Sequence, residues 1–201
     1  MRKADLSKNH QKFESTLVDY ANYLDRLLNA LRVVRPHDKK EIAEGAFLKL
    51  CARWESFVDE ELVDCVNIDC SKLADFVDAQ LPKNLSLDMC RAIIFRGGYL
   101  DFRSVAQLKE FAKKILPDHV NPFRLIRSLT ARKIDEMLII RNYLSHYSRK
   151  ARRALFAIYK QSYSMQVFRE PAHFLLANRA RRFIEYFRAL MDASDQMKGI
   201  I

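Results

Sequence analysis

The 201-residue sequence predicts an all-α protein, an antiparallel bundle of four long helices with short helices inserted between the second and the third. Three observations support this fold class. Apolar side chains recur every three or four residues along four long segments. We find no sustained alternation of apolar and polar residues, which a half-buried strand would show. The sequence also holds only four Gly and five Pro, too few for the many turns of a β-sandwich.

The first long helix is expected over about residues 9–34 and the second over about residues 38–66. Pro36 separates them, because the residue before a proline avoids the helical conformation. Asp38 is expected to cap the second helix, with Glu41 three residues later completing a capping box. The two predicted core stripes are Phe13, Leu17, Tyr20, Leu24, Leu27 and Leu31 in the first helix, and Phe47, Leu50, Trp54, Phe57, Val58, Leu62 and Cys65 in the second.

Residues 67–122 are expected to form a helical insertion within a single domain that spans residues 1–201. Proline and glycine residues interrupt this segment, so it is too broken to build a large core of its own. The pattern predicts three short helices, at Ser71–Val77, Ser86–Phe95 and Ser104–Leu116.

The third long helix is expected from Ser128 to about Gln161, and the fourth from Pro171 to about residue 192. Pro171 suits the first turn of a helix, where its missing N–H has no intrahelical partner. A helical wheel of the third helix predicts a core-facing arc, which consists of Met137, Ile140, Tyr143, Leu144, Tyr147, Ala151, Ala154, Leu155 and Ile158.

The formal net charge is +10, and the positive charge lies in the second half of the chain. Residues 1–100 hold 15 basic and 16 acidic residues, whereas residues 101–201 hold 20 and 9. A basic half of this size favours a polyanionic partner, most often nucleic acid or a membrane surface. The alternatives are a solubilising surface and an acidic protein partner.

No metal, cofactor or membrane site is expected. The four cysteines have no C-x-x-C pair that could aim two ligands at one zinc ion. No apolar run approaches the ~18 residues of a membrane-spanning helix, and the N-terminal residues lack the apolar core of a signal peptide. We therefore expect a cytoplasmic protein with reduced cysteines, which are Cys51, Cys65, Cys70 and Cys90.

The polar face of the third long helix carries basic and hydrogen-bonding residues without an acid, namely Arg141, Asn142, Ser145, His146, Arg149, Arg152 and Arg153. A neutral His can act as a general base, and an Arg can stabilise charge that develops on phosphorus. Cleavage of RNA without a metal ion needs these groups, because a base must deprotonate the ribose 2′-OH before it attacks the adjacent phosphate. The alternative is a solvated basic helix face with an incidental His.

The spacing of Arg141 and His146 limits how they can cooperate. Residues five apart are separated by about 140° on a straight helix, so the two side chains converge only through a local distortion or through pairing with a second copy of the helix. Arg32 and His37 repeat the same spacing, but they straddle a proline, and the apolar Val33 follows the Arg. We interpret this second pair as a chance match.

The motif residues Arg141-Asn142-Tyr-Leu-Ser-His146 resemble the R-[polar]-x3-H motif of HEPN domains (higher eukaryotes and prokaryotes nucleotide-binding). The stretch ARWESFVDEEL in the second helix resembles the Trp-Glu-x-Phe stretch of RiboL-PSP-type and related HEPN families. The resemblance covers about residues 38–66 and 128–192. HEPN domains are helical bundles, and many are metal-independent ribonucleases of toxin–antitoxin, phage-defence or RNA-processing systems.

The resemblance implies that Arg141 and His146 are the catalytic pair of an endoribonuclease that leaves a 2′,3′-cyclic phosphate. Asn142 would orient the motif or bind phosphate. HEPN active sites are usually composite, so the resemblance also implies a homodimer, and an antitoxin is a further partner that it suggests. The alternative function is an inactive dimerisation or adaptor module that binds nucleic acid or an acidic protein.

Several residues are candidates for supporting this site. Glu55 lies at the edge of the apolar arc of the second helix, where it could hold Arg141 or His146 across the bundle. The alternative is that Glu55 is an acid at the core boundary that pairs with any nearby base and has no functional role. Ser145 accompanies the motif on the polar face. The residues expected to extend the path of the RNA are Arg149, Lys150, Arg152 and Arg153.

Overall fold

The computed structural model of the protein describes residues 3–31, 33–96, 98 and 100–200, and these residues form helices without any strand. The predicted all-α class is confirmed. No helix among the described residues is long and apolar enough to cross a membrane. The helices are α1 (Leu6–Ala30), α2 (Pro36–Ile68), α3 (Ser71–Val77), α4 (Leu87–Phe95), α5 (Val105–Ile115), α6 (Ser128–His146), α7 (Arg149–Tyr163) and α8 (Pro171–Met197), with 3-10 turns at Asp118–Val120, Pro122–Leu125 and Lys198–Ile200.

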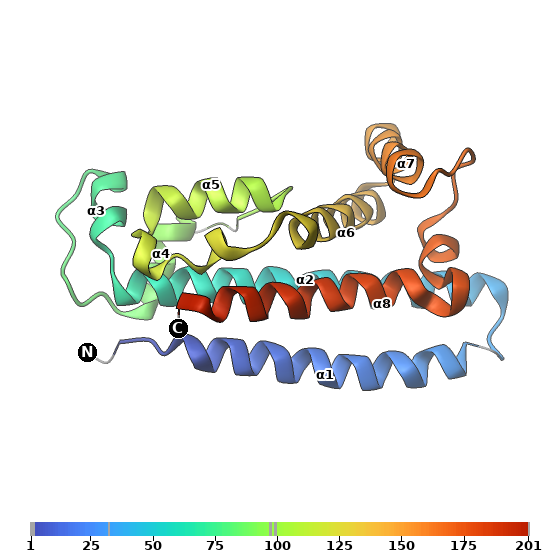
Figure 1. Ribbon diagram of the computed structural model, residues 1–201, viewed down its shortest axis with the longest axis horizontal. Helices are drawn as coiled ribbons and strands as arrows, with labels where there is room; N and C mark the ends of the chain where they lie inside the picture. Colours follow the sequence, from blue (N-terminus) through green and yellow to red (C-terminus); the bar gives the residue numbers. More distant parts are fainter. Residues whose placement is uncertain (1–2, 32, 97, 99, 201) are drawn as a thin grey trace.

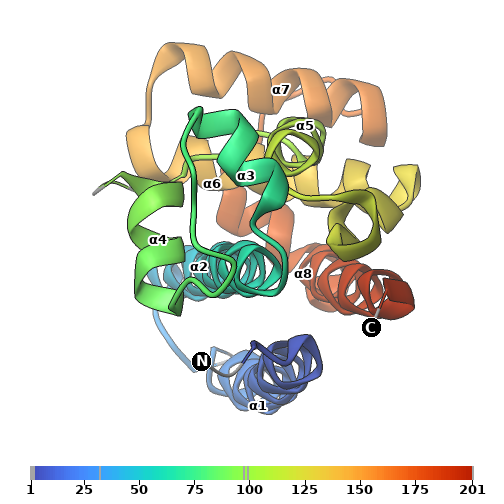
Figure 2. The ribbon, with the colours of Figure 1, turned by 90° about the vertical axis from the view of Figure 1, so that its left-hand side faces the viewer.

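Three long helices run nearly along one axis (Figure 1). Helices α2 and α8 point in the same direction and α1 points in the opposite one. Helix α6 crosses the α2–α8 pair obliquely, on the side opposite α1 (Figure 2). The second and fourth long helices thus run parallel, as in an up-down-up-down bundle, but the oblique crossing of α6 means that the regular antiparallel four-helix bundle is not confirmed.

The predicted apolar stripes form the core between these helices. Every predicted stripe residue of α2 is buried, and so are those of the first helix except Leu27, which packs against the core from its edge. Helix α2 begins at Pro36, two residues before the predicted cap Asp38, which lies instead in the first helical turn. This start suits proline, because the first helical position needs no backbone N–H.

The insertion forms its three helices close to the predicted boundaries. Ser86 and Ser104 are the N-caps of α4 and α5, and their hydroxyl oxygens accept hydrogen bonds from the backbone N–H groups of Met89 and Gln107 at 3.2 Å. Helix α4 packs on α2, and α5 packs on α6. The insertion therefore covers the side of the molecule that carries the motif helix.

A buried polar network joins α1, α2 and α8. Nδ1 of His10 lies 2.8 Å from the Ser194 hydroxyl, and its Nε2 lies 3.2 Å from Oε1 of Glu61. The second Glu61 oxygen accepts a hydrogen bond from the Asn9 amide at 2.7 Å. His10, Glu61 and Ser194 are almost fully buried, so this Ser-His-Glu arrangement has no access to a substrate and fixes three helices in register.

The prediction of one continuous third helix is wrong, because this segment forms two helices, α6 and α7. Helix α6 ends at His146, Tyr147 has a left-handed backbone (φ 46°), and α7 then crosses above α6 (Figure 2). Ser148 caps α7, and its hydroxyl accepts a hydrogen bond from the Ala151 N–H at 3.1 Å. Beyond His146 the predicted core arc is therefore confirmed only in part. Tyr147 is 56% exposed and Ala154 is exposed, although Ala151 and Leu155 are buried.

Helix α8 is also less regular than predicted. The backbone leaves the helical conformation from Ala177 to Ala180, with positive φ at Asn178, Arg179 and Ala180. The helix resumes beyond this point and buries Phe183, Tyr186 and Leu190 against α2 and α6.

Candidate functional site

The motif residues lie at the C-terminal end of α6, beside a hollow of about 570 Å³. We call this the motif hollow. Its lining residues are Leu138, Ile139, Arg141, Asn142 and His146 from α6, Ser148, Lys150, Ala151 and Ala154 around the start of α7, and Asp101, Phe102 and Arg103 before α5. The structure thus brings all three predicted catalytic residues to one concave surface. Ser145 is exposed on α6 but does not line the hollow.

Two carboxylates hold the guanidinium of Arg141, which is only 24% exposed. Nε of Arg141 lies 3.1 Å from Oε1 of Glu55 on α2, and Nη1 lies 3.4 Å from Oδ1 of Asp101, just before α5. A guanidinium carries five N–H donors, so these two contacts fix its orientation and leave donors for a phosphate. Glu55 contacts Arg141 as the sequence suggested, whereas Asp101 was missed because it lies in an irregular segment.

His146 is exposed at the last position of α6, and its ring shares the motif hollow with Asn142. Among the described residues, no hydrogen bond joins His146 to Arg141. The helix breaks only after His146, so Arg141 and His146 both lie on a regular helical segment. This distortion therefore does not bring their side chains together. In the second Arg-x4-His spacing, Arg32 lies outside the described residues, and His37 is exposed in the first turn of α2.

The cations of α7 do not continue the motif face as the sequence predicted, because the chain turns at Tyr147. Lys150 lines the motif hollow. Arg149, Arg152 and Arg153 line a second hollow of about 370 Å³, which they share with Phe156; we call it the arginine hollow.

The buried carboxylate of Glu44 fixes the turn between α6 and α7. Its Oε2 accepts a hydrogen bond from the Tyr147 hydroxyl at 3.0 Å, and its Oε1 accepts one from the backbone N–H of Ala172 at 3.3 Å. Burial raises the pKa of Glu44. Burial and the hydrogen bond to Glu44 raise the pKa of Tyr147 to about 12. One carboxylate on α2 therefore positions the end of α6 and the start of α8.

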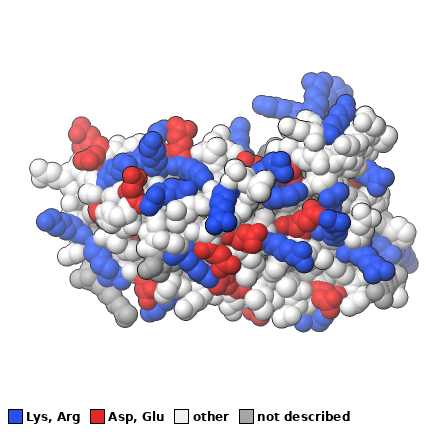
Figure 3. All heavy atoms as spheres, in the orientation of Figure 1, with Lys and Arg blue, Asp and Glu red and all other residues white. Residues whose placement is uncertain are grey.

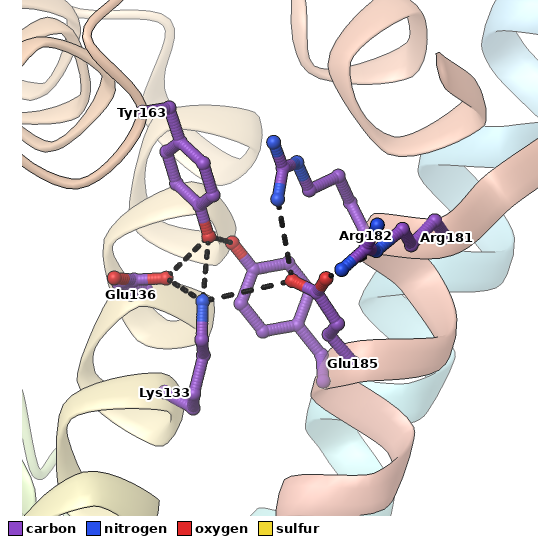
Figure 4. Close-up of polar contacts among 7 residues, drawn as sticks. Lys133, Glu136, Tyr163, Arg181, Arg182 and Glu185 are labelled. Atoms are coloured by element: carbon purple, nitrogen blue, oxygen red, sulfur yellow. Dashed lines mark hydrogen bonds and ion pairs between the residues drawn. The ribbon is translucent and has the colours of Figure 1, made fainter. Parts of the chain in front are cut away.

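A second buried carboxylate, Glu136, anchors the far end of α7 (Figure 4). Its Oε2 accepts hydrogen bonds from the Tyr163 hydroxyl at 2.6 Å and from Nζ of Lys133 at 3.0 Å, and Lys133 also donates to Tyr163 at 2.8 Å. Burial alone would lower the pKa of Lys133, but its hydrogen bonds to Tyr163 and Glu136 raise it. Because Tyr163 is the last residue of α7, this network fixes the helix at its C-terminal end.

Two arginines of α8 beside this network are paired with a carboxylate. Arg181 and Arg182 both contact Glu185, at 3.0 and 3.4 Å (Figure 4). The Arg182 guanidinium also lies 4.0 Å from the centre of the Tyr163 ring. Sequence reasoning missed Glu44 and Glu136, although both are acids at core-facing helical positions, where an unpaired carboxylate would be costly.

Two carboxylates of α2, those of Glu55 and Asp59, lie in a partly desolvated environment. Burial raises the pKa of Glu55, and the Arg141 guanidinium opposes this rise. One turn later, burial raises the pKa of Asp59 to about 6, against the opposing charge of Arg91. Among the described residues, no group of three or more His, Cys, Asp or Glu side chains is arranged to hold a metal ion.

The chain matches no known family model, no curated protein and no solved structure. Any function assigned to the motif hollow therefore rests on the chemistry and geometry of its own residues.

The raised pKa of Asp59 predicts a pH-dependent stability. The folded protein binds this proton up to about pH 6, whereas the unfolded chain releases it near the ordinary value of 3.8. The resulting contribution to stability is present at low pH and is lost as the pH rises through 6. Replacing Asp59 with Asn removes the ionised, desolvated form. We therefore expect D59N to raise the melting temperature more at pH 7.5 than at pH 4.5.

Calorimetry of D59N and of D25N at both pH values checks this prediction. Asp25 is an exposed residue of α1, and its replacement should shift the melting temperature equally at the two pH values. An equal shift for D59N would contradict the burial effect on Asp59.

Proposed function

We propose that the protein is a metal-independent endoribonuclease of the HEPN type. The observation that supports this function best is that Arg141, Asn142 and His146 line one hollow together with Lys150. The hollow offers an imidazole, a fixed guanidinium, an amide and an ammonium to a polyanion. This set supplies a proton acceptor and three hydrogen-bond donors for a phosphodiester.

In the proposed reaction, His146 removes the proton from a ribose 2′-OH, and the 2′-oxygen attacks the adjacent phosphorus. The bond from phosphorus to the 5′-oxygen breaks, and the His146 imidazolium returns its proton to that oxygen, so His146 acts first as the general base and then as the general acid. The products are a 2′,3′-cyclic phosphate and a 5′-hydroxyl. Arg141 stabilises the charge that develops on the phosphoryl oxygens, while Glu55 and Asp101 keep its guanidinium oriented. Asn142 donates a hydrogen bond to the same phosphate.

The alternative function is an inactive HEPN-like adaptor that binds nucleic acid or an acidic protein. The two carboxylates on Arg141 favour this alternative in one respect, because a phosphate must share the guanidinium with them. Retention of both Arg141 and His146 in the motif hollow favours the enzyme.

The proposed chemistry predicts that H146A and R141A each lower kcat/KM for RNA cleavage by about 10²- to 10³-fold, because each variant lacks a group that acts in the transition state. The measurement is cleavage of an end-labelled single-stranded RNA in EDTA. H37A is the matched control, since His37 is an exposed imidazole with the same spacing from an upstream Arg. Its activity should equal that of the parent protein.

The outcomes separate the candidate functions. Equal cleavage by the parent protein and both motif variants would eliminate the motif hollow as the active site. Cleavage that disappears in EDTA would eliminate the metal-independent mechanism. Tight RNA binding without any cleavage by the parent protein would favour the adaptor.

We further propose that the active site is composite and that two copies of the chain pair across their motif hollows. In one chain Arg141 and His146 line the same hollow without a hydrogen bond between them, so we propose that a second copy supplies a further Arg or His to each site. Light scattering at micromolar concentration should then give twice the mass of 23.6 kDa. A monomer that cleaves RNA with full activity would show that one chain suffices.

A further inference from the structure

Helix α7 carries five basic residues and no acidic one, namely Arg149, Lys150, Arg152, Arg153 and Lys160. Only Ala151, Leu155 and Tyr159 of this helix are buried against the body of the protein. The five basic side chains are exposed, and within the described part of the chain none of them forms an ion pair with a carboxylate. Figure 3 shows a projecting group of blue Lys and Arg atoms over α7.

The two hollows lie on opposite sides of α7. Residues two apart on a helix are separated by about 200°, so Lys150 and Ala154 face away from Arg152 and Phe156. Lys150 and Ala154 line the motif hollow, whereas Arg152 and Phe156 line the arginine hollow. Helix α7 therefore separates the motif hollow from the arginine hollow.

Aromatic rings lie against two cations of α7, of which Arg152 lines the arginine hollow. The Arg152 guanidinium lies 4.1 Å from the centre of the Phe168 ring, and Nζ of Lys160 lies 4.5 Å from the centre of the Phe156 ring. Neighbouring cations without a counter-charge repel one another, and a bound anion relieves this repulsion. Guanidinium groups bind phosphate in a bidentate manner, and an aromatic ring provides a surface on which a base can stack.

We infer that the arginine hollow is a docking site for the backbone of single-stranded RNA, and that the strand crosses α7 to reach the motif hollow. This inference rests on the proposed ribonuclease function. A helix with its side chains is about 10–12 Å across, and a stacked strand advances about 3.4 Å per nucleotide. An RNA must therefore extend three or more nucleotides beyond the cleaved bond to contact both hollows.

The test compares two triple variants with the same change in net charge. One is R149Q/R152Q/R153Q, and the other is R26Q/R35Q/R188Q, whose arginines are exposed on α1, before α2 and on α8. Both are made in the H146A background, and binding of a fluorescein-labelled 12-nucleotide RNA is measured between 0.05 and 0.3 M salt. Each phosphate contact contributes about 0.7 to the salt slope. The α7 variant should therefore lose about 2 from that slope and bind about 100-fold more weakly at 0.1 M salt, whereas the control should stay within about twofold.

A second readout uses chains with His146 intact. The parent protein should cleave the 12-nucleotide RNA with a higher kcat/KM than a dinucleotide, and R149Q/R152Q/R153Q should lose that advantage. Equal weakening of RNA binding by both triple variants would overturn the docking site in favour of net charge alone. Equally tight binding of a poly-glutamate peptide and RNA would overturn RNA as the occupant.

The two readouts also separate this inference from the proposed function. If R149Q/R152Q/R153Q binds RNA as tightly as the parent protein and still cleaves it in a His146-dependent way, the docking site is overturned and the ribonuclease function stands. Selective loss of RNA binding in that variant, in a protein that cleaves no RNA, would support the docking site and overturn the ribonuclease.

Discussion

The point at which α7 begins depends on hydrogen bonds to the buried carboxylate of Glu44. This carboxylate accepts bonds from Tyr147, at the turn between α6 and α7, and from the backbone N–H of Ala172, at the start of α8. Tyr147 has a left-handed backbone, which is unfavourable for a residue with a Cβ atom. The bond to Glu44 and the Ser148 cap offset this cost. The turn ends the motif helix at His146 and directs the cations of α7 across it.

Acids of α2, in the nearly neutral first half of the chain, thus position groups of the basic second half. Glu44 holds the turn after the motif, and Glu55 holds the guanidinium of Arg141. Within the second half, Glu136 and Glu185 engage the cations around the C-terminal end of α7 (Figure 4). Helix α7, which separates the two hollows, carries five basic residues and no acidic one, so it accounts for +5 of the formal net charge of +10. We therefore assign half of the charge excess of the sequence to a local surface beside the candidate active site.

Much of the fold could be predicted from local patterns, because apolar spacing and serine caps act within a few residues. The stripes of α1 and α2 and the caps Ser86 and Ser104 are examples. The break at Tyr147 could not be predicted in this way, because the apolar and polar arcs of the wheel continue through it. It depends on a tyrosine bonding to a glutamate 103 residues away in sequence. The site divides along the same line: the motif and the Glu55 contact follow from the sequence, whereas the Asp101 contact and the second hollow depend on tertiary packing.

The nature of the RNA ends produced in EDTA tests the central claim most directly, because only attack by the 2′-oxygen leaves a cyclic phosphate. The substrate is a defined single-stranded RNA together with a copy that lacks the 2′-hydroxyl at the cleaved position. Mass spectrometry should find a 2′,3′-cyclic phosphate and a 5′-hydroxyl for the first RNA and no cleavage at that position in the second. Products with a 3′-hydroxyl and a 5′-phosphate, or cleavage of the deoxy-substituted RNA at that position, would contradict the account.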